Sequence, residues 1–317
     1  MTEMQIDFCW LDENDERIGT ADNLDFSESE LLWAALTVGA PSYAIAIRNI
    51  LDAPAFALHK WCAIRSVADI NGQEIHLSPN YFNLDQSEKV VLSYWVGMIF
   101  AKLVAKKILN VPWMAHARIL QKEERLDVYP PNTKSLPDLV GFDDSENWHV
   151  IEAKGLQKKP SVDNERHYRN QAKRIVAING KPPETKNYCI TYIREQFKIN
   201  LHDPNSEPEE PVKFDIKPLD LQKHYYEPYI TFFNDMKNPI DPLSDGSIIY
   251  KKVMCDTIDK KKILIGIVRE VFDKLTRQKD QLIKEYHLKE NIWDKIGLVD
   301  KDTYIGPDGI VVKLVTV

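Results

Sequence analysis

The chain has 317 residues, of which 44% are hydrophobic and 28% are charged, and its formal net charge is −7. This composition is ordinary for a globular protein and excludes a disordered or low-complexity chain. The longest apolar run, Val90 to Ala101, is shorter than the roughly 20 residues that cross a bilayer, so we expect no membrane partner. The acidic N-terminal stretch lacks the pattern of a signal peptide, which predicts a cytoplasmic protein.

Charge is distributed unevenly along the chain. Residues 1–60 carry eleven Asp and Glu against three Lys and Arg, whereas residues 151–200 carry eleven Lys and Arg against five acids. A locally basic surface on an acidic protein is compatible with phosphate binding, although a solvated helix face has the same composition. The four cysteines are far apart and match no metal or redox spacing, so we expect reduced thiols and no zinc.

In chain order, residues 1–84 predict an acidic α/β region. It begins with a strand and continues into a helix whose start is marked by the capping pair Ser27 and Glu30. Residues 85–200 predict a second domain with the order helix, three strands, helix, strand. The expected elements are a helix at 87–109, strands at 112–120, 136–142 and 148–153, a helix at 163–178 and a strand at 187–193.

Residues 201–317 predict a third region. It opens with a Pro-rich, acidic stretch that is typical of an exposed connector. An aromatic segment follows, then a long charged helix from about 260 to 288, and finally a hairpin that turns at residues 306–309.

The segments 136–142 and 148–153 form one predicted hairpin, because a cluster of turn-forming residues at 143–147 separates them. Side chains alternate along a strand, so Glu152 and Lys154 point to the same face, and Asp138 on the neighbouring strand is able to join them. A buried carboxylate is costly unless it is paired or binds a metal. The alternative is a cross-strand salt bridge on an exposed edge, which does not account for two acids within apolar strands.

Two carboxylates, together with a backbone carbonyl such as that of Ala153, suit Mg²⁺, which prefers oxygen ligands, and Mn²⁺ is able to substitute for it. A metal held there would polarise a phosphoryl oxygen and activate water. Lys154 would orient or deprotonate that water, or stabilise the developing negative charge.

The motif Pro137-Asp138 with Glu152-Ala153-Lys154, and the helix and strand order around it, resemble the PD-(D/E)xK nuclease superfamily over residues 86–195. The resemblance implies an α/β fold with a restriction-endonuclease-like core, a mixed sheet flanked by helices, extended here by N- and C-terminal α/β regions. It implies that Asp138 and Glu152 bind the metal and that Lys154 is the catalytic lysine. It also makes Gln171 a candidate catalytic residue and Glu88 a candidate metal ligand, although Glu88 has an alternative role at a helix N-terminus.

The expected activity is that of a Mg²⁺-dependent endodeoxyribonuclease acting on double-stranded DNA, in restriction or antiphage defence. The candidate phosphate contacts are Lys158, Lys159, Arg169, Lys173 and Arg174. A protein partner would supply any motor or trigger, because the chain contains no phosphate-binding loop motif. The sequence leaves open whether the protein forms a homo-oligomer. One alternative is an inactive nuclease-fold subunit that binds DNA or a partner. The other is a protein unrelated to nucleases in which the pattern is accidental.

Overall fold

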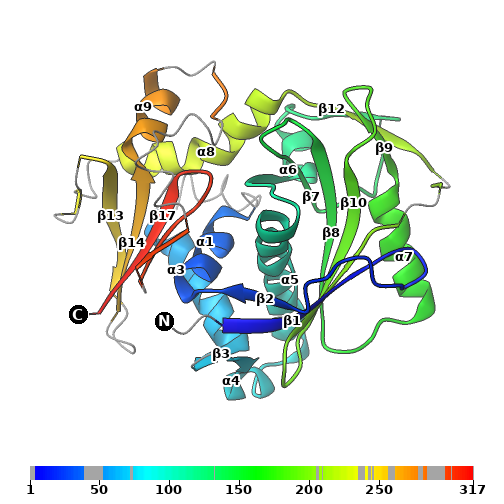
Figure 1. The fold of residues 1–317 in the computed structure, drawn as a ribbon, viewed down its shortest axis with the longest axis horizontal. Helices are drawn as coiled ribbons and strands as arrows, with labels where there is room; N and C mark the ends of the chain where they lie inside the picture. Colours follow the sequence, from blue (N-terminus) through cyan, green and yellow to red (C-terminus); the bar gives the residue numbers. More distant parts are fainter. Residues whose placement is uncertain are drawn as a thin grey trace.

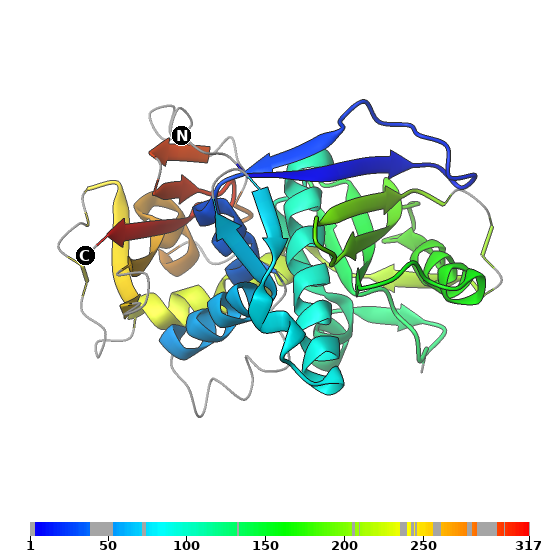
Figure 2. The same ribbon diagram turned by 90° about the horizontal axis from the view of Figure 1, so that it is seen from below.

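A computed structural model of the chain is shown in Figure 1 and, turned by 90°, in Figure 2. The structure describes residues 4–38, 53–71, 74–131, 133–204, 207–208, 210–234, 240–241, 244, 246–255, 261–277, 281–283, 297–300 and 302–316. Among these residues, no helix is both long and apolar enough to cross a membrane.

The largest sheet has nine strands. Eight of them follow the order β3-β4-β1-β11-β10-β8-β7-β5, and β2 pairs with β1. Their bounds are β1 Met4–Leu11, β2 Asn23–Phe26, β3 Ala68–Asn71, β4 Glu74–Leu77, β5 Trp113–His116, β7 Leu139–Phe142, β8 Trp148–Leu156, β10 Thr185–Tyr192 and β11 Lys198–His202.

This sheet is mixed. Strands β5, β7 and β8 are antiparallel neighbours, and β10 runs parallel to β8. Strand β11 is antiparallel to β10 and parallel to β1, so the N-terminal strand belongs to the same sheet. A mixed sheet flanked by helices confirms the expected α/β class. The domain boundaries at residues 84 and 200 stay a prediction.

Two helices cover opposite faces of the sheet at β8 and β10: α5 (Gln86–Ile108) and α7 (Val162–Lys173). On the α7 side, Ala172 packs against Ile190, which is the register partner of Lys154. On the α5 side, a Cβ added to Gly97 would lie only 2.5 Å from the backbone nitrogen of Gly155. Because successive strand residues face opposite sides, α7 covers the face that carries Lys154.

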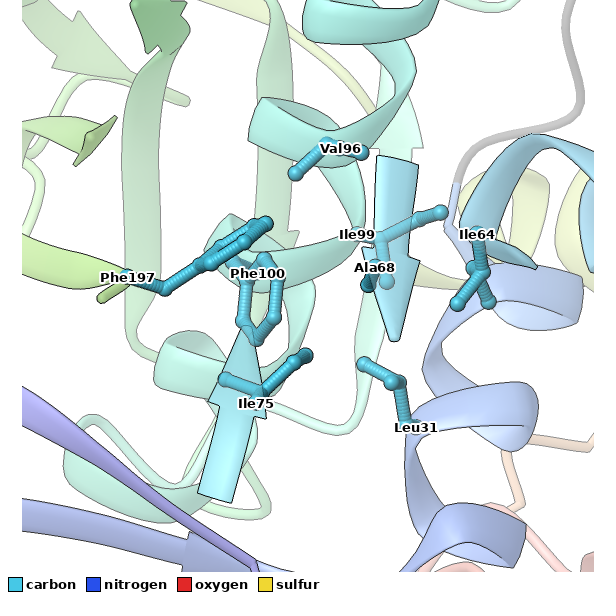
Figure 3. Close-up of a pocket in the computed structure, with 8 residues that line it drawn as sticks. All are labelled: Leu31, Ile64, Ala68, Ile75, Val96, Ile99, Phe100 and Phe197. Atoms are coloured by element: carbon cyan, nitrogen blue, oxygen red, sulfur yellow. The ribbon is translucent and has the colours of Figure 1, made fainter. Parts of the chain in front are cut away.

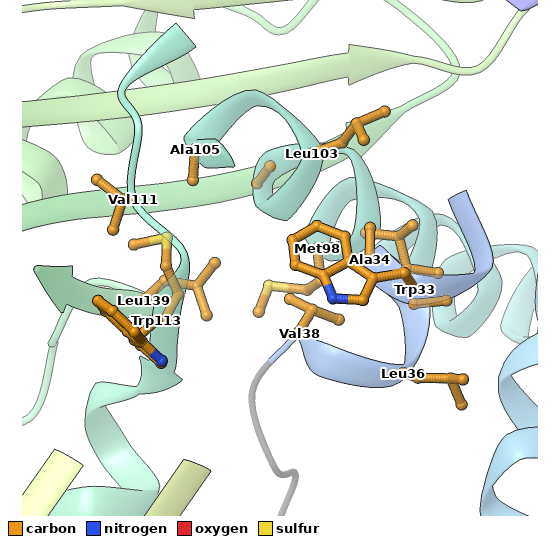
Figure 4. Packing of buried hydrophobic residues seen from close by; sticks show 14 of the residues in the cluster. Trp33, Ala34, Leu36, Val38, Met98, Leu103, Ala105, Val111, Trp113 and Leu139 are labelled. Carbon is orange, nitrogen blue, oxygen red and sulfur yellow. The ribbon is translucent and has the colours of Figure 1, made fainter. Parts of the chain in front are cut away.

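Helix α5 is also the centre of the hydrophobic core. Its side chains Met98 and Leu103 share one buried cluster with Trp33 of α1 and Trp113 of β5 (Figure 4). A small pocket beside α5 is lined only by apolar residues, among them Ile99 and Phe100 (Figure 3), and we interpret it as a packing gap in this core. The other helices described before β7 are α1 Glu28–Thr37, α3 Ala53–Val67, α4 Pro79–Phe82 and α6 Ala117–Lys122.

The described residues form two smaller sheets as well. One has the order β6-β12-β9, and the other has the order β13-β14-β17-β16-β15 and lies across α1 from the large sheet (Figure 1). The bounds are β6 Asp127–Tyr129, β9 Ile175–Ile178, β12 Val212–Asp215, β13 Ile248–Cys255, β14 Lys261–Val268, β15 Gly297–Asp300, β16 Thr303–Ile305 and β17 Ile310–Thr316, with the helices α8 Pro218–Asn234 and α9 Arg269–Arg277.

Several local expectations are confirmed. Ser27 caps α1 by accepting a hydrogen bond from the Glu30 N–H (3.0 Å). The expected helix at 87–109 is α5, and the expected hairpins correspond to the pairs β7–β8 and β16–β17. The strand expected at 187–193 is β10. These elements follow from periodicity and turn residues over short stretches of chain.

Four expectations are wrong in part. The strand expected at 112–120 ends at His116 and continues as α6, and the helix expected at 163–178 ends at Lys173 and is followed by β9. The connector expected after residue 200 contains β12, which pairs with β9. The helix expected at 260–288 is β14 and then α9 up to Arg277, and residues 278–280 and 284–288 lie outside the described residues. In the last three cases a β-branched or apolar run pairs with a strand distant in sequence, and this pairing overrides the local pattern.

Candidate active site

The β7–β8 hairpin places Asp138 and Glu152 side by side. Leu139 pairs with Ile151, so Asp138, which precedes Leu139, lies opposite Glu152. The Asp138 N–H donates to Glu152 Oε2 (3.2 Å), and the Ala153 N–H donates to Asp138 Oδ2 (3.0 Å). Each carboxylate is therefore held by the backbone of the opposite strand.

The turn between the strands is closed by its own polar residues. The Asp143 N–H donates to the Asn147 carbonyl (3.0 Å), and the Asn147 N–H donates back to Asp143 Oδ1 (2.8 Å). Glu146 takes the left-handed backbone conformation that this turn requires, with φ of 63°. This turn fixes the register of the hairpin and thereby the pairing of the two acids.

Lys154 completes the cluster. It lies two residues after Glu152 on the same face of β8, and its Nζ donates to Glu152 Oε1. Nζ is also 3.6 Å from Asp138 Oδ2 and 5.2 Å from the centre of the Tyr168 ring of α7. The three charged residues that the sequence predicted to converge do lie together, and a cation–π contact adds a fourth side chain.

Burial controls the electrostatics of this cluster. The Glu152 side chain is only 1% exposed, and its burial, together with the nearby Asp138 charge, raises its pKa to about 8. Burial also raises the pKa of Asp138. Burial disfavours the Lys154 ammonium as well, but the two carboxylates outweigh this effect and raise the pKa of Lys154.

The cluster fits a divalent cation. Two carboxylates and one ammonium leave one negative charge uncompensated among these groups, in a place with little access to water. A proton on Glu152 or a bound cation would neutralise that charge. Since both acids offer only oxygen donors, the residues fit Mg²⁺ or Mn²⁺.

The side chains of Gln171 and Glu88 bond to residues outside the cluster of Asp138, Glu152 and Lys154. Gln171 of α7 donates from Nε2 to Ser135 Oγ (3.2 Å), in the loop that leads to Asp138. Glu88 is exposed in the first turn of α5, where its Oε2 accepts the N–H of Asp85 (3.0 Å) in a capping box. Glu88 therefore has the helix-terminus role that was its alternative, and its side chain is used by the cap rather than by the acid pair.

The five candidate phosphate contacts do not form one free basic face. Lys158 and Lys159 are exposed in the loop after β8. Arg169 donates to the Glu13 carbonyl and to the Tyr188 hydroxyl, and Lys173 is buried. Arg174 pairs with the Glu210 carboxylate and donates to the Ser135 carbonyl (3.3 Å). Phosphate binding stays a prediction for the two exposed lysines, while the other three serve contacts within the protein.

Sequence reasoning missed two tyrosines at this site. Tyr168 contacts Lys154 from α7, and its position three residues before Gln171, on the same helix face, was an available signal. Tyr94 of α5 is 42% exposed, and burial of its hydroxyl together with the charges of Asp138 and Glu152 raises its pKa. The sequence offered no signal for Tyr94, because the same helix carries other aromatic residues and the exposure of this one is visible only in the structure.

No family model, curated protein or solved structure matches the chain. The interpretation of the site therefore rests on its own residues and their geometry.

Proposed function

We propose that the chain is a metal-dependent nuclease of the PD-(D/E)xK type that hydrolyses phosphodiester bonds. The observation that carries this proposal is the convergence of Asp138, Glu152 and Lys154, with a surplus negative charge, on one face of a buried hairpin. The order β5-β7-β8-β10, with α5 before it and α7 between its last two strands, supports the proposal because it is the order expected for a restriction-endonuclease-like core.

Each residue of the cluster has a proposed role. Asp138 and Glu152 would hold Mg²⁺, which supplies Lewis-acid polarisation of a phosphoryl oxygen and a more acidic bound water. Lys154 would act as an ammonium, because the carboxylates raise its pKa, and its Nζ would donate to the oxygen on which negative charge develops. Tyr168 would keep Nζ in position. Gln171 would support the loop before Asp138 through Ser135.

The proposed substrate is double-stranded DNA, with Lys158 and Lys159 as phosphate contacts. Their loop begins close to the site, because it follows the end of β8 at Leu156, two residues after Lys154. A setting in restriction or antiphage defence, with a partner that triggers cleavage, rests on analogy of fold.

The test is a cleavage assay of plasmid, linear duplex, single-stranded DNA and RNA in Mg²⁺, Mn²⁺ or EDTA. Wild type is compared with Glu152→Gln and Lys154→Met. The matched control is Glu184→Gln, which changes the exposed acid of another Glu-x-Lys sequence in the chain. We expect metal-dependent cleavage that falls by about 100- to 1,000-fold in the two site variants, because loss of one electrostatic group costs that much. Cleavage by the control should be unchanged.

A second measurement separates the alternative function from the main one. If wild type does not cleave but binds Mn²⁺ in calorimetry through Asp138 and Glu152, the enzyme needs a partner and the proposal stands. Wild type that binds DNA but neither cleaves it nor binds Mn²⁺ would instead identify an inactive DNA-binding subunit. Cleavage that survives both Glu152→Gln and Lys154→Met would refute this site.

A further inference from the structure

A second group of metal-binding side chains lies on the same face of the large sheet, two strands from the candidate active site. Tyr188 of β10 is the register partner of both Glu152 of β8 and His202 of β11, and register partners share a face. Beside His202, Asp15 extends from the β1–β2 connection and Glu165 from α7. One ligand atom from each of Asp15, Glu165 and His202 lies within 4.8 Å of the other two.

His202 is the residue that points to a ligand. It is only 3% exposed, and neither of its ring nitrogens has a hydrogen-bond partner among the described residues. The Tyr188 ring stacks on the imidazole with centroids 4.2 Å apart, which fixes the plane of the ring. Its Nδ1 lies 3.4 Å from Asp15 Oδ1, so the imidazole edge is directed at this group. A buried nitrogen without a partner destabilises the fold, so a ligand that pairs with it would offset that cost.

An ion-pair network explains only part of the arrangement. Arg169 Nη2 lies 3.8 Å from Asp15 Oδ1, and the same guanidinium donates to the Glu13 carbonyl (2.6 Å) and the Tyr188 hydroxyl (3.4 Å). Arg169 thus supplies one positive charge to the two carboxylates of Asp15 and Glu165, which leaves one negative charge uncompensated among these groups. It donates no hydrogen bond to the imidazole.

We propose that Asp15, Glu165 and His202 form a Zn²⁺ site separate from the candidate active site. One imidazole nitrogen and two carboxylate oxygens are ligands that Zn²⁺ takes, with water in the fourth position. Ligand atoms in a tetrahedral zinc site lie about 3.3–3.6 Å apart, which follows from bonds of about 2.0–2.2 Å. The Nδ1 to Oδ1 distance already falls in this range.

Such an ion would join three separate segments: the β1–β2 connection, α7 and β11. Helix α7 also carries Tyr168, so the ion would help to hold that ring over Lys154. The sequence predicted no zinc because that expectation considered cysteine spacing alone. Ligands as far apart in the chain as residues 15, 165 and 202 have no spacing signature.

The experiment measures Zn²⁺ affinity of the full, metal-stripped chain by competition with a chromophoric chelator. The Asp138→Asn/Glu152→Gln double variant removes the other candidate metal site, and further variants add His202→Gln or Asp15→Asn to it. Asp15 is exposed, so its replacement keeps the test valid if the His202 variant does not fold. The matched control is Asp22→Asn, an exposed acid in the same connection that pairs with Arg17.

We expect the double variant and the control to bind one Zn²⁺ with equal affinity. Adding His202→Gln or Asp15→Asn should weaken binding by about 100-fold or more, because loss of a residue behind a metal ligand already costs 10–100-fold. X-ray absorption should show only nitrogen and oxygen ligands. Absence of binding in the double variant, or unchanged affinity with both added substitutions, would overturn the site. Because the double variant lacks the proposed catalytic acids, these results are independent of the nuclease assay.

Discussion

Lys154 is held by contacts from two directions. The carboxylates of Glu152 and Asp138 attract its ammonium from the sheet, and the Tyr168 ring faces it from α7. A free lysine side chain samples many rotamers, and restricting it costs about 1.5–2 kcal/mol of conformational entropy. In this cluster the surrounding groups hold Nζ in place before any substrate is present. Preorganised charge of this kind is more effective in catalysis than charge that must reorganise.

The cation–π contact predicts different effects for two substitutions of Tyr168. Tyr168→Phe keeps the ring face over Nζ and should leave cleavage near the wild-type rate. Tyr168→Leu removes the ring and should lower kcat about fivefold, which corresponds to a contact of about 1 kcal/mol, with KM little changed. Steady-state kinetics on the preferred DNA substrate would measure both values. Equal losses in the two variants would show that the hydroxyl, rather than the ring, matters.

Between elements, the crossing of α5 and β8 depends on two glycines. A Cβ on Gly155 would overlap the Ser93 carbonyl of α5, and a Cβ on Gly97 would lie 2.7 Å from the Lys154 carbonyl carbon. This close approach sets the distance between α5 and the strand that carries Glu152 and Lys154. The strand is therefore positioned by backbone contact on one face, while its functional side chains project from the other.

Substitution of Gly155 tests this close approach. Gly155→Ala should lower the free energy of unfolding by about 1–3 kcal/mol, the usual cost of overpacking. Gly246→Ala is the matched control, because an added Cβ there meets no atom within 4 Å, and it should change stability by less than about 0.5 kcal/mol. Urea denaturation followed by tryptophan fluorescence measures both. A Gly155→Ala variant as stable as the control would mean that α5 and β8 separate easily.

The loop between β8 and α7 gives a second prediction at the scale of elements. In a Glu152→Gln background, which we expect to bind DNA without cutting it, Lys158→Gln/Lys159→Gln should reduce the slope of log K against log salt by about 2 for duplex DNA, because two phosphate contacts are lost. Arg174→Gln should leave the slope unchanged, since Arg174 pairs with Glu210. Fluorescence anisotropy measures this slope. The titrations cover roughly 50 to 200 mM salt, the range over which affinity due to phosphate contacts falls strongly. An unchanged slope in the lysine variant would show that DNA binds to another surface of the protein.

At the scale of the whole molecule, a buried polar junction links the C-terminal sheet to the rest of the protein. Asp308, in the β16–β17 turn, accepts hydrogen bonds from Trp33 Nε1 of α1 (3.0 Å), from the Tyr225 hydroxyl of α8 and from the Ile310 N–H (3.0 Å). Lys102 of α5 lies beside it and donates to the Tyr225 hydroxyl (3.4 Å). Four segments that are distant in sequence therefore meet at one fully buried carboxylate and one fully buried amine.

This junction predicts a specific dependence of stability on pH. Burial lowers the pKa of Lys102 from 10.5 to about 7, against the opposing effect of Asp308. Between pH 7 and 10.5 the unfolded chain keeps a proton that the folded chain has lost, so stability rises with pH in this window. The unfolding free energy of wild type should therefore gain about 2 kcal/mol over that of Lys102→Met between pH 7 and 9.

Urea denaturation at pH 7, 8 and 9 provides the measurement. Lys122→Met replaces an exposed lysine, and its difference from wild type should stay constant across the same range. A constant difference for Lys102→Met as well would mean that its amine stays protonated inside the junction.

Many features of the candidate site were predictable from local sequence. The hairpin, its turn at 143–147 and the shared face of Glu152 and Lys154 follow from the two-residue period of a strand and from the turn residues. The register that brings in Asp138 follows from the same turn. The start of α5 follows equally from its Asp85 and Glu88 caps. All of these depend on interactions between residues close in the chain.

Other features depend on contacts between distant segments, and only the tertiary structure decided them. The run from Ile175 to Ile178 reads as the end of a helix, yet it forms a strand because β12 pairs with it. Arg169 and Arg174 read as a basic helix face, yet each has partners outside the helix.

The α/β class and the acid–acid–lysine hairpin were predictable from the sequence alone, because periodicity and turn chemistry act over a few residues. The joining of β1 to the sheet, the partners of the basic residues and the meeting of Asp15, Glu165 and His202 are known only from the folded structure. The physical reason is that hydrogen-bond pairing, burial and charge compensation between distant segments depend on which surfaces come together. No local pattern in the chain encodes that choice.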